Sequence, residues 1–219
     1  MSSVDNKPMD IFKGWDNHID RIRQSWLESV GEDDIVLLGG DLSWAMTLEN
    51  ASADLDFVAG LPGHKVLIRG NHDYWWKSIS GLRAKLADKV YALQNDSIKI
   101  GKYVICGTRG WTVPEKHQSE QDLKIYNREI ERLKLSLQSM QAIVSESDTI
   151  ISMAHYPPFN SQLASTPFTD LYNQYNVKKV IYGHLHGKNV KVPHVVTIGE
   201  TSFYLTSCDQ INHSVVQID

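Results

Sequence analysis

The chain has 219 residues, of which 42% are hydrophobic and 22% charged, with a formal net charge of −4; we expect residues 1–219 to form a single soluble domain. The acidic balance argues against binding to duplex nucleic acid. No apolar run approaches the roughly 20 residues of a membrane span, and two distant cysteines cannot form a disulfide framework, so we expect a cytoplasmic protein with no membrane association.

The first half of the chain predicts strands that alternate with helices. After a stretch without periodicity, an apolar stripe from Ile19 to Val30 indicates a helix. Two apolar runs then end in Gly-Gly-Asp (39–41) and in Gly-Asn-His-Asp (70–73), as buried strands end. Because a right-handed crossover places both strand ends at one edge of a parallel sheet, Asp41 and Asn71 should lie close together. We predict helices at about 16–30 and 48–59, and strands at 35–38 and 65–69.

In the second half of the chain, predicted strands are again followed directly by polar residues. One strand ends at His155, before two prolines that can continue neither a helix nor a ladder. Another ends in Gly-His-Leu-His-Gly (183–187), and a Gly101-Lys102 hairpin joins two earlier strands. We predict helices at 78–87, 119–147 and 170–175, and strands at 90–93, 97–100, 103–106, 148–154, 179–182, 195–198, 202–206 and 214–218.

Metal-capable side chains thus follow four predicted strands. Residues two apart in an extended segment point the same way, so His184 and His186 should face one side. Mixed nitrogen and oxygen donors suit Mn²⁺, Fe²⁺, Ni²⁺ or Zn²⁺ better than an all-oxygen Mg²⁺ or Ca²⁺ site. The candidate ligands are Asp41, Asn71, His155, His184 and His186.

The three polar residues of the Gly-Asn-His-Asp turn could also act together in catalysis. The amide oxygen of Asn71 can bind a cation, His72 can donate a proton, and Asp73 can hold that histidine in one tautomer. Asn, Gly and Asp are also the commonest turn formers, so the turn by itself is compatible with a purely structural role.

The order of these motifs from Gly40 to Gly187 resembles the calcineurin-like metallophosphoesterase family, with four of its five motifs present. The resemblance implies an α/β fold, a four-layer α/β/β/α sandwich of two mixed β-sheets flanked by helices, with two divalent metal ions (Mn, Fe, Zn or Ni) at the sheet edges. It implies that Asp41 bridges the metals, that Asn71, His155 and His184 complete one shell, and that His186 serves the other. His72 would protonate the leaving oxygen, with Asp73 orienting it.

The family's first motif, an Asp-x-His at the end of a first strand, is missing. Asp16-Asn17-His18 comes nearest but lies at a predicted helix start. We therefore expect a truncated or mis-started form of a longer protein. Such a chain should hold at most one metal well, show weakened activity, and expose the sheet edge where the first strand belongs.

Several residues near the predicted site have two interpretations. Trp44, Trp75, Trp76 and Trp111 could form an aromatic wall for a substrate ring, although core packing is the commoner role of such residues. Arg109 could bind a substrate phosphate or hold its loop, and the second role is favoured. His213 and the remaining histidines should lie on the surface or in loops.

The resemblance therefore implies a metal-dependent phosphoesterase that hydrolyses a small-molecule phosphomonoester or phosphodiester with metal-activated water. The alternative is a non-catalytic metal-binding or scaffold protein with the same fold.

Overall fold

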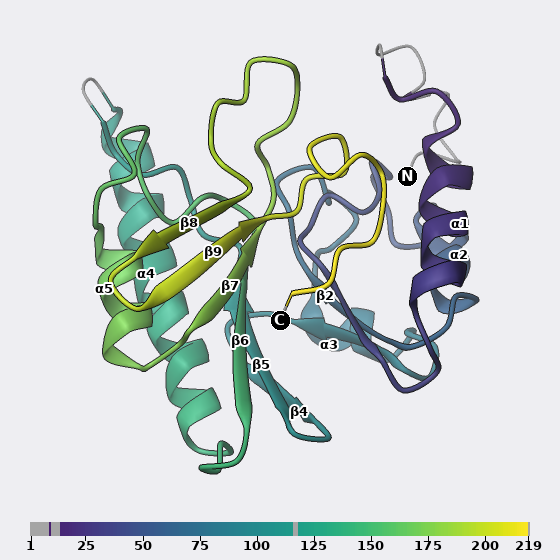
Figure 1. Cartoon of the computed structure of the whole chain (residues 1–219), viewed down its shortest axis with the longest axis horizontal. Helices are drawn as coiled ribbons and strands as arrows, with labels where there is room; N and C mark the ends of the chain where they lie inside the picture. The colour runs from purple at the N-terminus through teal and green to yellow at the C-terminus, as the bar shows by residue number, and fades with distance from the viewer. Residues whose placement is uncertain (1–8, 10–13, 116–117, 219) are drawn as a thin grey trace.

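Two β-sheets lie face to face between helices in this computed structural model, which describes residues 9, 14–115 and 118–218 (Figure 1). The smaller sheet has the order β1-β2-β3 and the larger has the order β4-β5-β6-β7-β9-β8. The strands are β1 (Ile35–Leu38), β2 (His64–Ile68), β3 (Val90–Leu93), β4 (Ser97–Ile100), β5 (Tyr103–Thr108), β6 (Thr149–Ala154), β7 (Lys179–Tyr182), β8 (Val195–Ile198) and β9 (Thr201–Leu205).

Helices cover the outer faces of both sheets, which confirms the predicted four layers. Figure 1 shows α4 and α5 on the larger sheet and the first three helices beside the smaller one. None of the described helices combines the length and apolar character that a membrane span requires. The helices are α1 (His18–Ser29), α2 (Ser52–Ala59), α3 (Ile79–Arg83), α4 (Glu120–Gln141) and α5 (Pro167–Gln174).

The strand directions correct one detail of the prediction. Both strand pairs of the smaller sheet are parallel, so only the larger sheet is mixed. In the larger sheet, β4 and β5 form the predicted antiparallel hairpin at Gly101, and β8 runs antiparallel to β9. The parallel pairs bring the ends of β1 and β2 to one edge, as expected.

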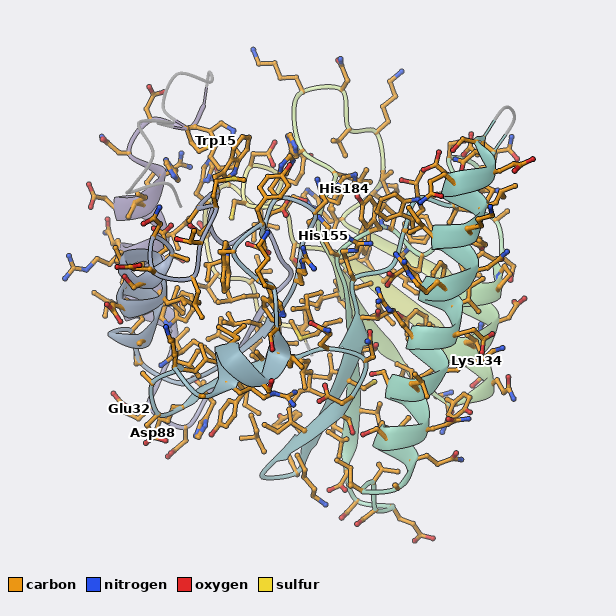
Figure 2. All side chains as sticks on the ribbon, turned by 180° about the vertical axis from the view of Figure 1, so that it is seen from behind. Trp15, Glu32, Asp88, Lys134, His155 and His184 are labelled. Carbon is orange, nitrogen blue, oxygen red and sulfur yellow. The ribbon has the colours of Figure 1, made fainter. Side chains whose placement is uncertain are left out.

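The core follows from the alternation of side chains along each strand. Val66 and Ile68 of β2 pack against Ile105 of β5 between the sheets, whereas Leu67 faces the helices on the other side. On β5, Val104 is buried against α4. Figure 2 shows side chains lying between these layers. Apolar residues on both faces of a strand explain why these runs are almost continuously hydrophobic.

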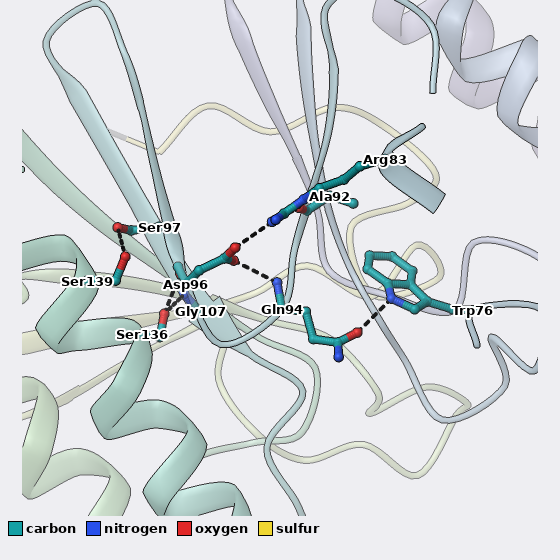
Figure 3. Close-up of polar contacts among 9 residues, drawn as sticks. All are labelled: Trp76, Arg83, Ala92, Gln94, Asp96, Ser97, Gly107, Ser136 and Ser139. Carbon is teal, nitrogen blue, oxygen red and sulfur yellow. Dashed lines mark hydrogen bonds and ion pairs between the residues drawn. The ribbon is translucent and has the colours of Figure 1, made fainter. Parts of the chain in front are cut away.

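Polar contacts fix the crossing from the smaller sheet to the larger one, between β3 and β4 (Figure 3). Arg83 of α3 pairs with the carboxylate of Asp96, which also accepts the backbone N–H of Gln94. The carbonyl of Asp96 accepts the hydroxyl of Ser136 on α4 at 2.6 Å. One connecting residue therefore links a helix on each side of the sandwich.

Helix ends differ from the prediction where side chains compete for backbone groups. The helix predicted at 119–147 begins after Ser119, whose side chain accepts the backbone N–H of Asp122, but it ends at Gln141. Near its predicted end, Asp148 accepts the backbone N–H of Ser145 at 2.7 Å and forms a turn instead. Likewise α2 begins four residues later than predicted, after a turn in which Thr47 accepts the N–H of Asn50.

The C-terminal segment 207–218 corrects one expectation. The strand predicted at 214–218 is not formed, because the backbone N–H of Val215 donates to the hydroxyl of Ser25 on α1 at 2.9 Å. His213 lies in a turn, in agreement with the expected surface or loop position, but it is 2% exposed and contacts the carbonyl of Gly14. His18, expected on the surface or in a loop, is instead buried in α1.

An open cavity lies beside β1, whose second edge has no strand partner within the described residues. The cavity measures about 1380 Å³ and is bounded by β1, the C-terminal segment and the inner face of the larger sheet. Several predicted site residues, including Asp41, His72 and His184, line its end.

Candidate metal centre

The loops after β1, β2, β6 and β7 meet at one edge of the two sheets. Figure 2 shows His155 and His184 side by side at this edge. The structure brings together four of the five predicted ligands, namely Asp41, Asn71, His155 and His184.

The amide oxygen of Asn71, as assigned, is the point on which the donor atoms converge. His155 Nε2 lies 2.7 Å from Asn71 Oδ1 and 3.4 Å from Asp41 Oδ2. His184 Nδ1 lies 3.0 Å from the same amide oxygen. Four side chains from four separate loops thus surround one small volume.

The protonation state of His155 determines which kind of ligand this volume can bind. His155 Nδ1 lies 2.8 Å from the carbonyl of Gly39, which can only accept, so this nitrogen carries the proton. Burial lowers the pKa of His155 to about 4, so the ring is neutral near pH 7 and its Nε2 has a free lone pair. That lone pair faces two oxygens of Asn71 and Asp41. An oxygen of Asn71, an oxygen of Asp41 and a neutral imidazole nitrogen form a donor set that fits a bound cation.

The second histidine is held in the same neutral state. Burial lowers the pKa of His184 to about 4, and neighbouring His155 acts in the same direction. Its ring packs on Tyr156, with the ring centroids 4.2 Å apart. A neutral imidazole is the form that binds metals.

The amide is essential to this arrangement. In the described part of the chain, no group of three or more His, Cys, Asp or Glu side chains is placed to hold a metal ion. The candidate centre is a mixed group that depends on the side-chain oxygen of Asn71.

Unusual backbone conformations bring these side chains together. Asp41 and His184 have positive φ angles of 57° and 65°, which residues with a Cβ adopt at some cost. Gly70 leaves room for Asp41, because a Cβ atom at Gly70 would lie 2.0 Å from Asp41 Oδ1. Backbone strain in two loops that carry candidate ligands is compatible with a functional site.

Asp73 does not orient His72, which corrects that prediction. Its carboxylate is fully buried and accepts the backbone N–H groups of Asp41, Gly70 and Ser43 at 2.7–3.2 Å. The indole N–H of Trp75 donates to it at 3.0 Å. Asp73 therefore joins the two loops that carry Asp41 and Asn71.

His72 lies beside the four converging residues. Its backbone N–H donates to Asp41 Oδ1 at 2.8 Å, and its ring stacks on Trp44. His186 also lines the cavity, but it is exposed and makes no described contact with the other four predicted ligands.

The remaining tryptophans and Arg109 pack within the protein. Trp75 and Trp76 are each 1% exposed and belong to the core. The guanidinium of Arg109 lies 4.8 Å from the ring centroid of Trp111 and pairs with the buried carboxylate of Glu129 at 3.4 Å. The favoured interpretation of Arg109 as a loop-holding residue agrees with these contacts.

Sequence reasoning missed two residues that shape the site. Glu129 on α4 pairs with Arg109, whose carbonyl accepts the backbone N–H groups of His155 and Tyr156 at 3.0 Å. The helical pattern predicts Glu129 on the solvent-exposed face of its helix, and this prediction is wrong, because its side chain is fully buried. Tyr156 was recognisable solely from its place directly after His155.

A comparison with protein families matches residues 10–188 to the model of the calcineurin-like phosphoesterases, whose members generally hydrolyse phosphoester bonds and bind divalent metals. No protein of curated function matches the chain.

Two solved structures are similar to the chain. TT1561 of Thermus thermophilus is 14% identical, with a TM-score of 0.60 over 88% of this chain and 84% of that protein. AQ665 of Aquifex aeolicus, a protein of unknown function, is 17% identical, with a TM-score of 0.45 over 93% and 81%. TT1561 therefore shares the fold. Since the family match spans most of the residues that carry the fold and the site, the chain belongs to the calcineurin-like phosphoesterase family.

Proposed function

We propose that this protein is a metal-dependent hydrolase of small-molecule phosphomonoesters or phosphodiesters. The observation that carries the proposal is the convergence of side-chain oxygen and nitrogen atoms of Asp41, Asn71 and His155 on one point, with His184 beside them. We further propose that residues 1–219 act as one domain, because the core cluster between the sheets takes residues from both.

The donor set supports a first-row divalent ion such as Mn²⁺, Fe²⁺, Ni²⁺ or Zn²⁺. When bound, such an ion lowers the pKa of water and neutralises charge on the phosphoryl oxygens. Asp41, Asn71, His155 and His184 would hold it. His186 would serve a second ion, since it lines the same cavity.

His72 has the position of a proton donor to the leaving group. Its backbone is fixed by Asp41, so its ring is held next to the group that binds the ion without being part of it. An imidazole that lines the cavity can protonate the departing oxygen, and such general acids contribute roughly 10²–10⁴-fold to rate.

The test compares metal-free protein with protein reloaded with Mn²⁺, using bis(4-nitrophenyl) phosphate and 4-nitrophenyl phosphate as substrates. We expect hydrolysis of at least one ester only after reloading. Asn71→Ala should lose both bound metal and activity, because the amide oxygen is the common contact of both histidines. His72→Ala should lower turnover about 100-fold while the metal content stays unchanged.

His64→Gln is the matched control, because His64 lies at the opposite end of β2 and should affect neither quantity. Loss of metal in His72→Ala would contradict the role given to His72. Metal binding without hydrolysis of any phosphate ester would instead favour the non-catalytic alternative.

A further inference from the structure

We propose that Trp44 is a positioning residue for His72, and that its indole fixes the imidazole in the orientation that donates a proton to the leaving group. This inference rests on the proposed function, in which His72 is that donor. Trp44 stacks on His72, and we assign its effect to that contact.

The ring of His72 lacks the kind of anchor that the other site histidines have. His155 is oriented by the carbonyl of Gly39 and His184 by the amide of Asn71. Within the described residues, neither ring nitrogen of His72 has a hydrogen-bond partner, and only its backbone N–H is bonded. The orientation of the imidazole must therefore come from packing.

Trp44 supplies that packing. The two rings are almost parallel, with an interplanar angle of 4° and a centroid separation of 4.7 Å. Tyr74 meets His72 edge-on, at 81° and 6.2 Å. A flat stack limits rotation of the imidazole about its Cβ–Cγ bond but leaves both nitrogens at the ring periphery. This suits a proton donor, because an orienting hydrogen bond would occupy one of the two nitrogens.

The rings of Trp44 and His72 belong to different loops, and hydrogen bonds hold each of these loops in place. Trp44 follows Ser43, whose backbone N–H donates to the buried Asp73 carboxylate and whose carbonyl accepts the indole N–H of Trp75. His72 precedes Asp73 and is bonded to Asp41. The stack therefore rests on a rigid base, and both rings line the cavity that contains the candidate ligands.

The first experiment replaces Trp44 in the full chain loaded with Mn²⁺. Trp44→Leu should lower kcat roughly tenfold, with KM and metal content unchanged. The loss should be larger for phenyl phosphate than for 4-nitrophenyl phosphate, because a poorer leaving group depends more on protonation. Trp44→Phe keeps a ring for stacking and should retain most of the rate.

The second experiment asks whether Trp44 acts only through His72. In a His72→Ala background, Trp44→Leu should cause no further loss of rate. Proton NMR gives a readout without activity: the His72 ring signals, identified by their absence in His72→Ala, should move when Trp44→Leu removes the indole. Tyr91→Leu is the matched control, since it removes another aromatic partner of a histidine, His64, at the far end of β2. It should change neither the rate nor these signals.

Equal losses for both esters, additive losses in the double variant, or unmoved His72 signals would each overturn the inference. An inactive wild-type protein would overturn the proposed function instead, and the NMR comparison would still decide whether Trp44 orients the ring.

Discussion

Gly70 and Asp41 are packed so closely that a single added methyl group would disrupt the site. A Cβ at Gly70 would also approach the backbone nitrogen of Asp41 to 2.4 Å. The backbone N–H groups of Gly70 and Asp41 both donate to the carboxylate of Asp73. Neither residue can therefore move without breaking one of these hydrogen bonds. The glycine is required by this close approach, since its own φ is not positive.

Gly70→Ala should therefore lower the free energy of unfolding by at least about 2 kcal/mol, as overpacking of a rigid site does. It should also abolish metal binding, because Asp41 is displaced. Gly81→Ala is the control: its Cβ would meet no atom closer than 3.6 Å, and it lies inside α3. Urea unfolding and metal analysis of both variants test the prediction. Equal stability of the two variants would contradict it.

At the scale of elements, α4 supports the site from behind the larger sheet. The carboxylate of Glu129 is fully buried and contacts Thr108 and Arg132 as well as Arg109. Since the carbonyl of Arg109 accepts the N–H of His155, this helix helps to fix the loop after β6.

Glu129→Gln should lower the free energy of unfolding by about 2–4 kcal/mol, because it leaves the partly buried Arg109 without its counter-charge. Glu131→Gln removes an exposed partner of Lys134 one turn away and should cost no more than about 0.5 kcal/mol. Chemical denaturation of the two variants measures the difference. Comparable small losses would show that Glu129 contributes no more than a surface charge.

The type of a secondary-structure element was predictable where the local sequence pattern alone determines it. Ile35–Leu38 and Lys179–Tyr182 are apolar runs that end in glycine, and both strands begin and end as predicted. The segment 214–218 has a similar apolar pattern, but its groups pack on α1, and periodicity cannot tell these outcomes apart. For the site, strand ends located Asp41, Asn71, His155 and His184. The contacts of Asp73 and Trp44 depend on a neighbouring loop, which no local pattern encodes.

At the scale of the whole molecule, the C-terminal segment returns to the beginning of the described chain. His213 contacts the carbonyl of Gly14 at 3.0 Å, and Arg21 of α1 donates to the carbonyl of Asn212 at 2.8 Å. The segment thus holds α1 against the rest of the protein, where Val215 packs with Trp26.

The stability that the contacts of His213 give to the folded protein should depend on pH. Burial lowers the pKa of His213 below its ordinary 6.5. The carbonyl of Gly14 and the carboxylate of Asp209 oppose this shift, and the nearby side chains of Arg21 and His18 add to it. As pH falls below 6.5, the unfolded chain takes up a proton that the folded protein resists, so the free energy of unfolding decreases. His213→Asn should reduce this decrease between about pH 7 and pH 5, measured by urea unfolding of metal-free protein. An unchanged slope would show that His213 does not contribute.

The buried carboxylate of Asp73 has a consequence for how an ion would enter. By gathering amide groups from both loops, it sets the spacing of Asp41 and Asn71 before any ion arrives. Capture then demands little ordering of the backbone, so the entropic penalty of association is small. Such a preorganised receptor should take up its ion at a rate governed by shedding of hydration water rather than by loop closure.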